Sequence, residues 1–168
     1  MSAAVPGRGA AGAGFAAPID DRWFEDYAPG SVHDLGTIAV DEAEVVAFAS
    51  RYDPQPFHVD AQAAAESPFG GLIASGWHTA ALMMRLFVDR YMSHVASLSS
   101  PGIDAMRWLR PVRPGDTLAV RITVAEARVS KSKPDRGIVT SDIEVSNQNG
   151  EPVMTMRAYN LVACRPVG

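Results

Sequence analysis

The segment that most constrains the fold is residues 75–96, a long stretch with helical periodicity. The first half of this stretch is apolar on every side, with its apolar residues at Trp77, Ala80, Ala81, Leu82, Met83 and Met84. A helix without a polar face is unstable on a protein surface, so we expect other elements to wrap around it. Arg85, Asp89 and Arg90 give the second half a polar edge, which predicts that the helix leaves the core there.

The remainder of the C-terminal half has the pattern of strands. Residues 103–109, 117–129, 138–146 and 153–164 are rich in β-formers, and turn sequences such as Pro-Gly-Asp and Asn-Gln-Asn-Gly separate most of them. Apolar and polar side chains alternate along residues 117–124, as in a strand with one buried face. A wrapped helix followed by hairpins predicts an α+β fold in which an antiparallel β-sheet wraps around a long central helix.

Two shorter helices and a strand are expected before the central helix. Residues 34–40 favour a strand, and Asp41 then stands as an N-cap, with Glu44 three residues later as in a capping box. The helix that follows should end near Tyr52. A short Ala-rich helix is predicted over residues 60–66, where Ser-Pro and Gly-Gly sequences end it.

Length and composition indicate a single domain with an N-terminal extension. The chain has 168 residues, of which 47% are hydrophobic, enough to build one core. Residues 1–18 are mostly Ala, Gly and Pro, so we expect a flexible tail, with the domain over residues 19–168. The sequence has neither a signal-peptide pattern nor an apolar stretch long enough to span a bilayer, which predicts a cytoplasmic protein without a membrane partner.

The charge and the single cysteine argue against several kinds of site. A net charge of -4 gives no basic surplus to displace counterions from a phosphate backbone, so nucleic acid is not an expected partner. Cys164 cannot form an internal disulfide, and no Cys/His cluster has the spacing of zinc ligands. We therefore expect no metal site.

The segment between the first two helices carries the strongest functional signal. Asp53 and His58 are five positions apart, and prolines at positions 54 and 56 stiffen the chain between them, so we expect an irregular connection rather than helix. Acid-base chemistry requires titratable groups that are rigidly placed. The alternative is a proline-rich loop whose Asp caps a helix and whose His lies in solvent.

Three landmarks give the chain a resemblance to the MaoC-like dehydratase and (R)-specific enoyl-CoA hydratase family. Tyr-Asp-Pro-Gln-Pro-Phe-His-Val-Asp (residues 52–60) resembles the family's Asp-x-Asn-Pro-x-His signature, with Gln55 in place of the usual Asn. Residues 69–79 resemble the loop and Gly that begin the family's central helix. Residues 110–118 resemble the strand, turn and strand that follow it. Together the landmarks reach from about residue 23 to residue 162.

The resemblance implies a hot-dog fold that assembles as a homodimer or a dimer of dimers. It also implies reversible addition of water to a 2-enoyl thioester, with an acyl-CoA as substrate and no cofactor other than that coenzyme A. In the family the residues that match Asp53 and His58 hold the reacting water between them. A base is needed to take a proton from water, and an acid to protonate the α-carbon, roles that this pair can fill. The order in which they act stays open at this point.

Substrate contacts are expected at the start of the central helix. The family position matched by Gly76 offers its backbone N–H to the thioester oxygen, and helix N-termini favour such negative charge. Ser75, Trp77 and Phe57 are further candidates for substrate binding. The alternative reading makes Ser75 only an N-cap and Gly76 only a packing residue. Met84 stands where some members have a hydroxyl, which leaves Ser75 or Thr79 as substitutes.

A second histidine and the choice of reaction leave further alternatives. His78, among apolar neighbours on the central helix, is predicted to be a hydrogen-bonded core residue rather than a catalytic one. Because unrelated activities share the hot-dog scaffold, the alternatives to a hydratase are an acyl-CoA thioesterase and a non-catalytic subunit that binds acyl thioesters.

Overall fold

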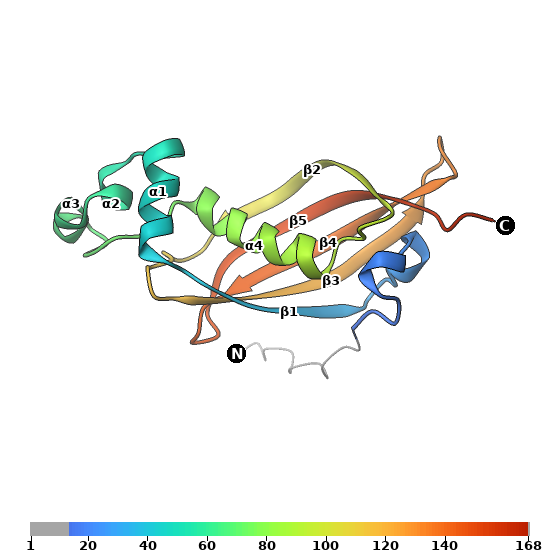
Figure 1. Cartoon of the computed structure of the whole chain (residues 1–168), viewed down its shortest axis with the longest axis horizontal. Coiled ribbons are helices and arrows are strands. Elements are labelled where there is room, and N and C mark those ends of the chain that lie inside the picture. The colour runs from blue at the N-terminus through green and yellow to red at the C-terminus, as the bar shows by residue number, and fades with distance from the viewer. Residues whose placement is uncertain (1–13, 168) are drawn as a thin grey trace, which may run out of the picture.

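A five-stranded antiparallel sheet, in the order β1-β3-β4-β5-β2, forms the frame of the molecule (Figure 1). The computed structural model describes residues 14–167. The strands are β1 (Val32–Ala39), β2 (Ser97–Trp108), β3 (Thr117–Val129), β4 (Arg136–Ser146) and β5 (Pro152–Ala163). The helices are α1 (Glu42–Tyr52), α2 (Pro56–Val59), α3 (Ala61–Glu66) and α4 (Gly76–Arg90), with short 3₁₀ turns at Ile19–Asp21 and Phe24–Asp26. The predicted α+β class is confirmed.

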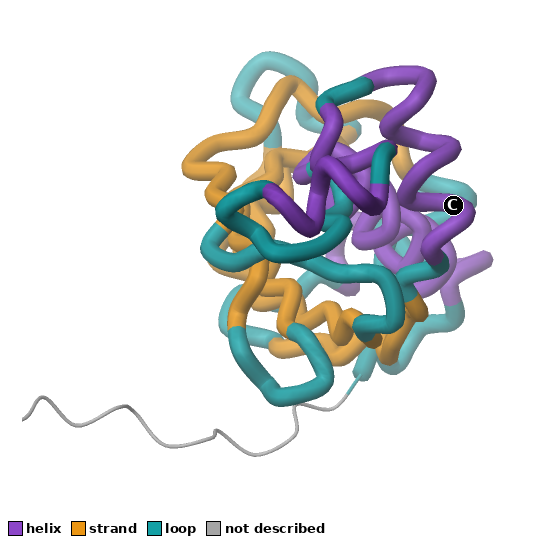
Figure 2. The backbone as a smooth tube through the Cα atoms, turned by 90° about the vertical axis from the view of Figure 1, so that its left-hand side faces the viewer, coloured by secondary structure: helices purple, strands orange, loops and turns teal. Residues whose placement is uncertain are grey.

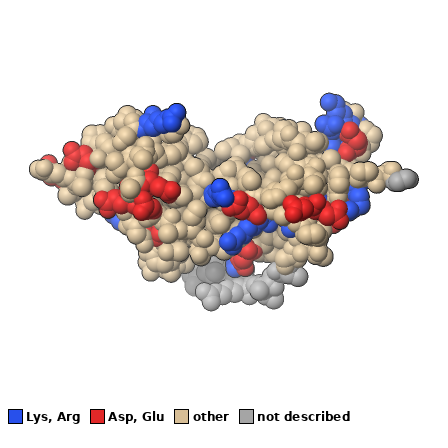
Figure 3. Space-filling view, viewed as in Figure 1, with Lys and Arg blue, Asp and Glu red and all other residues tan. Residues whose placement is uncertain are grey.

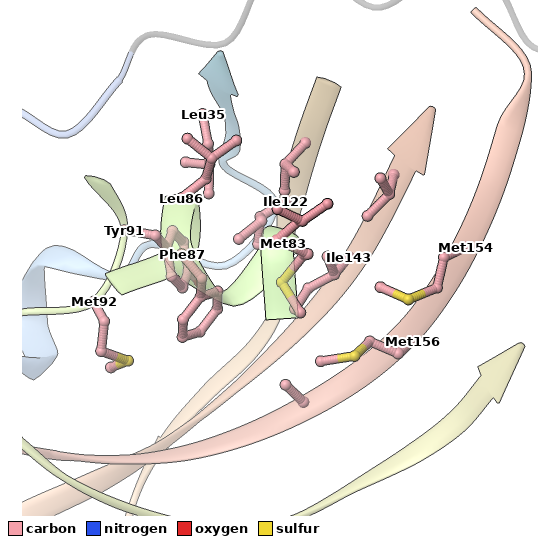
Figure 4. Close-up of a cluster of buried hydrophobic side chains, with 14 of the residues drawn as sticks. Leu35, Met83, Leu86, Phe87, Tyr91, Met92, Ile122, Ile143, Met154 and Met156 are labelled. Carbon is pink, nitrogen blue, oxygen red and sulfur yellow. The ribbon is translucent and has the colours of Figure 1, made fainter. Parts of the chain in front are cut away.

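The central helix α4 lies along one face of this sheet and supplies much of the core. In the end view of Figure 2 the strands curve along one side of the molecule and the helices fill the other. Met83 and Phe87 of α4 belong to the same buried cluster as Ile122 of β3, Ile143 of β4 and Met154 of β5 (Figure 4). Burying this apolar surface is the main force that holds the sheet against the helix.

One face of α4 nevertheless remains open, which corrects the prediction of a helix wrapped on every side. The side chains of Trp77 and Met84 are 58% and 45% exposed. The sheet covers only the face that carries residues such as Leu82, Met83 and Leu86. On the opposite face Met84 and Val88 are exposed, and Trp77 makes an edge contact with Trp108 of β2.

The central helix also ends earlier than predicted, at Arg90 instead of residue 96. After Tyr91 the hydroxyl of Ser93 accepts hydrogen bonds from the backbone N–H groups of Val95 and Ala96, at 3.2 and 2.9 Å. A serine that bonds to nearby backbone in this way competes with helix. The chain then enters β2 at Ser97, six residues before the predicted start, and pairs irregularly with β5.

The proline segment contains one turn of helix, α2, where we expected none. Pro56 is the first residue of this turn, a position at which the missing N–H would have no helical partner in any case. The N-terminal helix α1 and its cap agree with prediction, since the Asp41 side chain accepts a hydrogen bond from the Glu44 N–H. The strands predicted at residues 117–129, 138–146 and 153–164 are present with small changes at their ends.

The predicted tail is too long at its C-terminal end. Residues 1–13 lie outside the described part of the chain, but Phe15 packs on the domain. Its ring stacks on that of His33 with centroids 4.0 Å apart, and lies 5.1 Å from Tyr27 and 5.5 Å from Tyr91. An aromatic side chain gains by leaving water, so the ordered domain begins before residue 19. Among residues 14–167, no helix is long and apolar enough to cross a membrane.

Candidate active site

The junction between α1 and α2 brings the side chains of Asp53 and His58 into direct contact. Asp53 ends α1, where its backbone N–H donates to the Ala49 carbonyl, and Gln55 is the N-cap of α2. The single turn of α2 then turns His58 back toward Asp53. His58 Nε2 lies 3.3 Å from Asp53 Oδ2. The alternative of a histidine free in solvent is therefore wrong, because His58 is only 4% exposed.

A backbone carbonyl fixes the orientation of the His58 ring. Nδ1 lies 2.7 Å from the carbonyl oxygen of Ile73, in a buried contact. Because a carbonyl can only accept, Nδ1 must carry the hydrogen. In the neutral imidazole Nε2 is then the nitrogen with the free lone pair, and this atom faces Asp53.

Both oxygens of the Asp53 carboxylate accept hydrogen bonds from side chains. Gln55 Nε2 donates to Oδ1 and Ser75 Oγ donates to Oδ2, each at 2.7 Å. These two bonds hold the pKa of the Asp53 carboxyl below its usual value, and a protonated His58 ring lowers it further. The cause is that each bond stabilises the charged form.

The contact between the two groups changes where a water molecule can bind. The family resemblance implied a water held between the two side chains. Yet at 3.3 Å there is no room for a water in line between Nε2 and Oδ2. Both atoms line a common cavity, however, so a water beside the pair can contact both. Two acceptors that face the same space suit a molecule that donates two hydrogen bonds.

This cavity lies between the α1–α3 region and the end of β2 and has a volume of about 440 Å³. Figure 3 shows that the molecule is hollowed between the lobe of α1–α3 and the remainder, with mostly uncharged residues at the border. The lining combines the polar pair with apolar side chains. Its residues are Asp53, Gln55, His58, Phe69, Ile73, Ala74, Gly76, Trp77, Thr79, Trp108, Leu109, Arg110, Pro111 and Val112.

Of the four predicted substrate contacts, the cavity includes Gly76 and Trp77 but neither Ser75 nor Phe57. Ser75 has no exposed surface and its hydroxyl is turned toward Asp53. Phe57 packs against Phe69, with ring centroids 5.2 Å apart. Both were predicted from their position in the sequence, and both lie behind residues that line the cavity.

Sequence reasoning missed Trp108, the last residue of β2. Its indole lies over Gly76, and its Nε1 donates to the Gly76 carbonyl at 2.9 Å. A side chain at position 76 would overlap the indole ring, so the ring explains why glycine is needed there. The sequence carries no signal for this contact, because the two residues are 32 positions apart.

His78 and Met84 lie away from the Asp53 cavity. His78 is a buried core residue, as predicted, and its ring stacks on Phe48 at 4.9 Å. Its Nδ1 has no hydrogen-bond partner among the described residues, which corrects the expectation of a hydrogen-bonded histidine. Met84 is exposed and does not line the cavity.

A larger groove, of about 620 Å³, lies on the face of the sheet opposite α4. Its charged side chains are largely paired with each other, as Arg157 is with Asp142 and Tyr159 with Asp104. Within residues 14–167, no group of three or more His, Cys, Asp and Glu side chains is arranged to hold a metal ion. Asp53 and His58 are therefore the strongest candidates for catalysis.

Comparison with known proteins gives a consistent family. The model of the MaoC like domain matches residues 26–147. The solved structure of a MaoC-like dehydratase from Rhodospirillum rubrum is 44% identical, with a TM-score of 0.78, over 87% of this chain and 99% of that one. An (R)-hydratase from A. caviae involved in PHA biosynthesis is 26% identical, with a TM-score of 0.66, over 82% and 97% of the two chains.

A further relative is a 3-hydroxybutyryl-CoA dehydratase from Methylorubrum extorquens. It is 33% identical over 109 residues, which are 62% of this chain and 64% of the relative. The fold is the hot-dog fold that the resemblance implied. Since the family model spans most of the chain and includes the Asp53 to His58 segment, the chain belongs to the MaoC-like dehydratase family.

Proposed function

We propose that this protein adds water reversibly to the double bond of a 2-enoyl-CoA thioester, giving a 3-hydroxyacyl-CoA, with Asp53 and His58 activating the water. The observation that carries the proposal is the contact between His58 Nε2 and Asp53 Oδ2 on the wall of a cavity. The family membership supports the reaction class. The name of the M. extorquens relative supports a coenzyme A thioester.

The geometry favours His58 as the base in the hydration direction. The hydrogen bonds to Asp53 make its carboxylate a weak base, whereas the lone pair of His58 Nε2 is free to take a proton. Nε2 removes a proton from the water, and the oxygen bonds to the β-carbon. The π electrons move toward the thioester oxygen, and a proton from the pair is then delivered to the α-carbon. One water is added, and no other reactant is needed.

The backbone N–H of Gly76 is placed to stabilise the negative charge on the thioester oxygen. Gly76 is the first residue of α4, so its N–H has no partner inside the helix. It lines the same cavity as Asp53 and His58. The positive end of the helix adds a favourable field for an enolate-like oxygen.

We also propose that the protein assembles as a homodimer through β2. This strand is at the edge of the sheet, and nearly all of its side chains are exposed. An edge strand of this length is a template for pairing with another chain. Because β2 ends at Trp108, a second copy paired along it would also lie beside the cavity. Sedimentation as a monomer at assay concentrations would contradict this part of the proposal.

The reaction is tested with crotonyl-CoA and longer trans-2-enoyl-CoAs, by following both the enoyl absorbance and the release of free thiol. A hydratase removes the absorbance without releasing thiol, a thioesterase releases thiol, and a non-catalytic subunit does neither. We expect Asp53→Asn and His58→Ala each to lower the rate at least about a hundredfold.

Asp89→Asn and His94→Ala are matched controls, because both side chains are on the surface and outside the cavity. They should leave the rate unchanged. Full activity of either Asp53→Asn or His58→Ala, in protein with an unchanged circular dichroism spectrum, would refute the assignment of the pair.

A further inference from the structure

Asp53 is held by two side chains that belong to different parts of the chain. From this arrangement we infer that Ser75 and Gln55 are positioning residues, which keep Asp53 ionised and turned toward His58. The inference rests on the proposed hydratase function for its effect on rate, but its effect on Asp53 itself can be measured without any substrate. In this role neither residue reacts with the substrate or the water, since each acts through the Asp53 carboxylate.

The surroundings of Ser75 leave its hydroxyl hydrogen available for Asp53 alone among the described residues. Ser75 has no exposed surface, so water does not compete for its hydrogen bonds. Its Oγ accepts from the Trp77 N–H at 3.3 Å, and its one hydrogen points to Asp53 Oδ2 at 2.7 Å. A hydroxyl has only one hydrogen to donate, so the direction of this bond is fixed.

Through Ser75 the carboxylate is connected to the first turn of α4. The Ser75 carbonyl accepts from the N–H groups of His78 and Thr79, at 2.9 and 3.0 Å, which anchors the residue as the N-cap. The N-terminus of a helix carries partial positive charge. Asp53 therefore gains both a charge-assisted hydrogen bond and a favourable helix field from one residue 22 positions away.

Gln55, only two positions after Asp53, holds the second oxygen. Its Nε2 donates to Oδ1 at 2.7 Å from the N-cap position of α2. Gln55 is exposed, so water competes with this bond, and its effect should be smaller than that of Ser75. With one oxygen held from each side, the carboxylate cannot rotate without breaking a bond.

If Ser75 served only as a helix cap, its loss would weaken α4 but leave the ionisation of Asp53 unchanged. A positioning role predicts a change in that ionisation. The carboxyl carbon of Asp53 can be followed by NMR in protein labelled with ¹³C-aspartate, and Asp53→Asn identifies its signal. Ser75→Ala and Gln55→Leu should each move the titration midpoint of this signal to higher pH, because each removes a bond that favours the charged form.

Two further variants complete the experiment. Ser75→Thr keeps a hydroxyl and should titrate as the wild type does. Asp41→Ala removes the N-cap of α1, a capping contact of the same kind that does not touch Asp53, and should leave the midpoint unchanged. Gln55 is on the surface, so Gln55→Leu should fold even if the buried Ser75→Ala does not.

We expect Ser75→Ala also to lower kcat about tenfold with crotonyl-CoA, as a misdirected catalytic group does, with a smaller change in KM. Unchanged Asp53 midpoints in both variants would overturn the inference, whatever the activity. Shifted midpoints with an unchanged kcat, in an enzyme that turns over, would overturn the positioning role. A wild-type protein that is inactive on every enoyl-CoA would instead refute the proposed function, and the titration would still report on Ser75 and Gln55.

Discussion

Replacing Gly76 by alanine tests whether the contact with Trp108 requires glycine at this position. Gly76 is the first residue of α4, and alanine is the better helix former by up to about 1 kcal/mol, so helix propensity alone predicts a more stable protein. The structure predicts the opposite sign. A methyl group on this residue would overlap the indole of Trp108, so the ring must move away.

The expected loss can be worked from the contacts at this site. Forcing an extra methyl into a packed site costs about 1–3 kcal/mol. Displacing Trp108 also breaks the bond from its Nε1 to the Gly76 carbonyl, worth about 1 kcal/mol. The gain in helix propensity offsets part of this, and the indole, which is 46% exposed, can relax into solvent. We therefore expect Gly76→Ala to lower the free energy of unfolding by about 1–2 kcal/mol.

A double-mutant cycle with Trp108→Ala isolates this contact. Once the ring is absent, Gly76→Ala should be neutral or stabilising by up to about 1 kcal/mol, which gives a coupling energy of about 2 kcal/mol. The free energies come from guanidinium denaturation followed by far-UV circular dichroism, at one protein concentration because association would add to stability. A coupling energy below about 0.5 kcal/mol would show that the ring does not restrict position 76.

Three other predictions concern stability and the proline segment. Phe15→Ala should lower the free energy of unfolding by about 1–2 kcal/mol, because the ring is partly buried against His33, and guanidinium denaturation measures it. Burial lowers the pKa of His78, so the unfolded chain takes up its proton at higher pH than the folded protein does. Stability should therefore fall as the pH decreases below about 6.5, and His78→Asn should remove part of that slope in denaturation curves. Pro56→Ala should cost less than about 1 kcal/mol, mainly through the unfolded state, and should change kcat with crotonyl-CoA less than about threefold.

The strands and capped helices were predictable because their signals are local. Alternation along residues 117–124 follows directly from the period of a strand. The Asp41 and Glu44 capping pair likewise marks the start of α1 within four residues. The errors fall where a tertiary contact decides the outcome. Helix α4 ends earlier than predicted because the buried Ser93 hydroxyl bonds to the backbone that follows it. Phe15 is ordered because its ring packs against aromatic side chains of the domain.

The site was predictable only in part, for a related reason. Residue types and spacing indicated Asp53 and His58, the family resemblance added Gly76, and the structure brings all three to one cavity. One side of the wall comes from residues 108–112, and Trp108 is 32 positions beyond Gly76. Neither periodicity nor turn chemistry in the sequence indicates such a contact. Ser75 was predicted to contact substrate, because the sequence does not indicate that its hydroxyl points to Asp53, 22 positions away.

The forces that hold the pair also differ from those suggested by the sequence. The sequence suggests that two prolines fix Asp53 relative to His58, yet a pyrrolidine ring restricts only backbone torsions, those of its own residue and of the residue before it. The side chains are instead fixed by three hydrogen bonds. His58 Nδ1 donates to the Ile73 carbonyl, and Ser75 and Gln55 each donate to the Asp53 carboxylate. Two of these partners are in the segment that leads into α4. The geometry of the pair therefore depends on the docking of that segment against α1 and α2, and a substitution that loosens the docking should impair the chemistry while leaving both prolines in place.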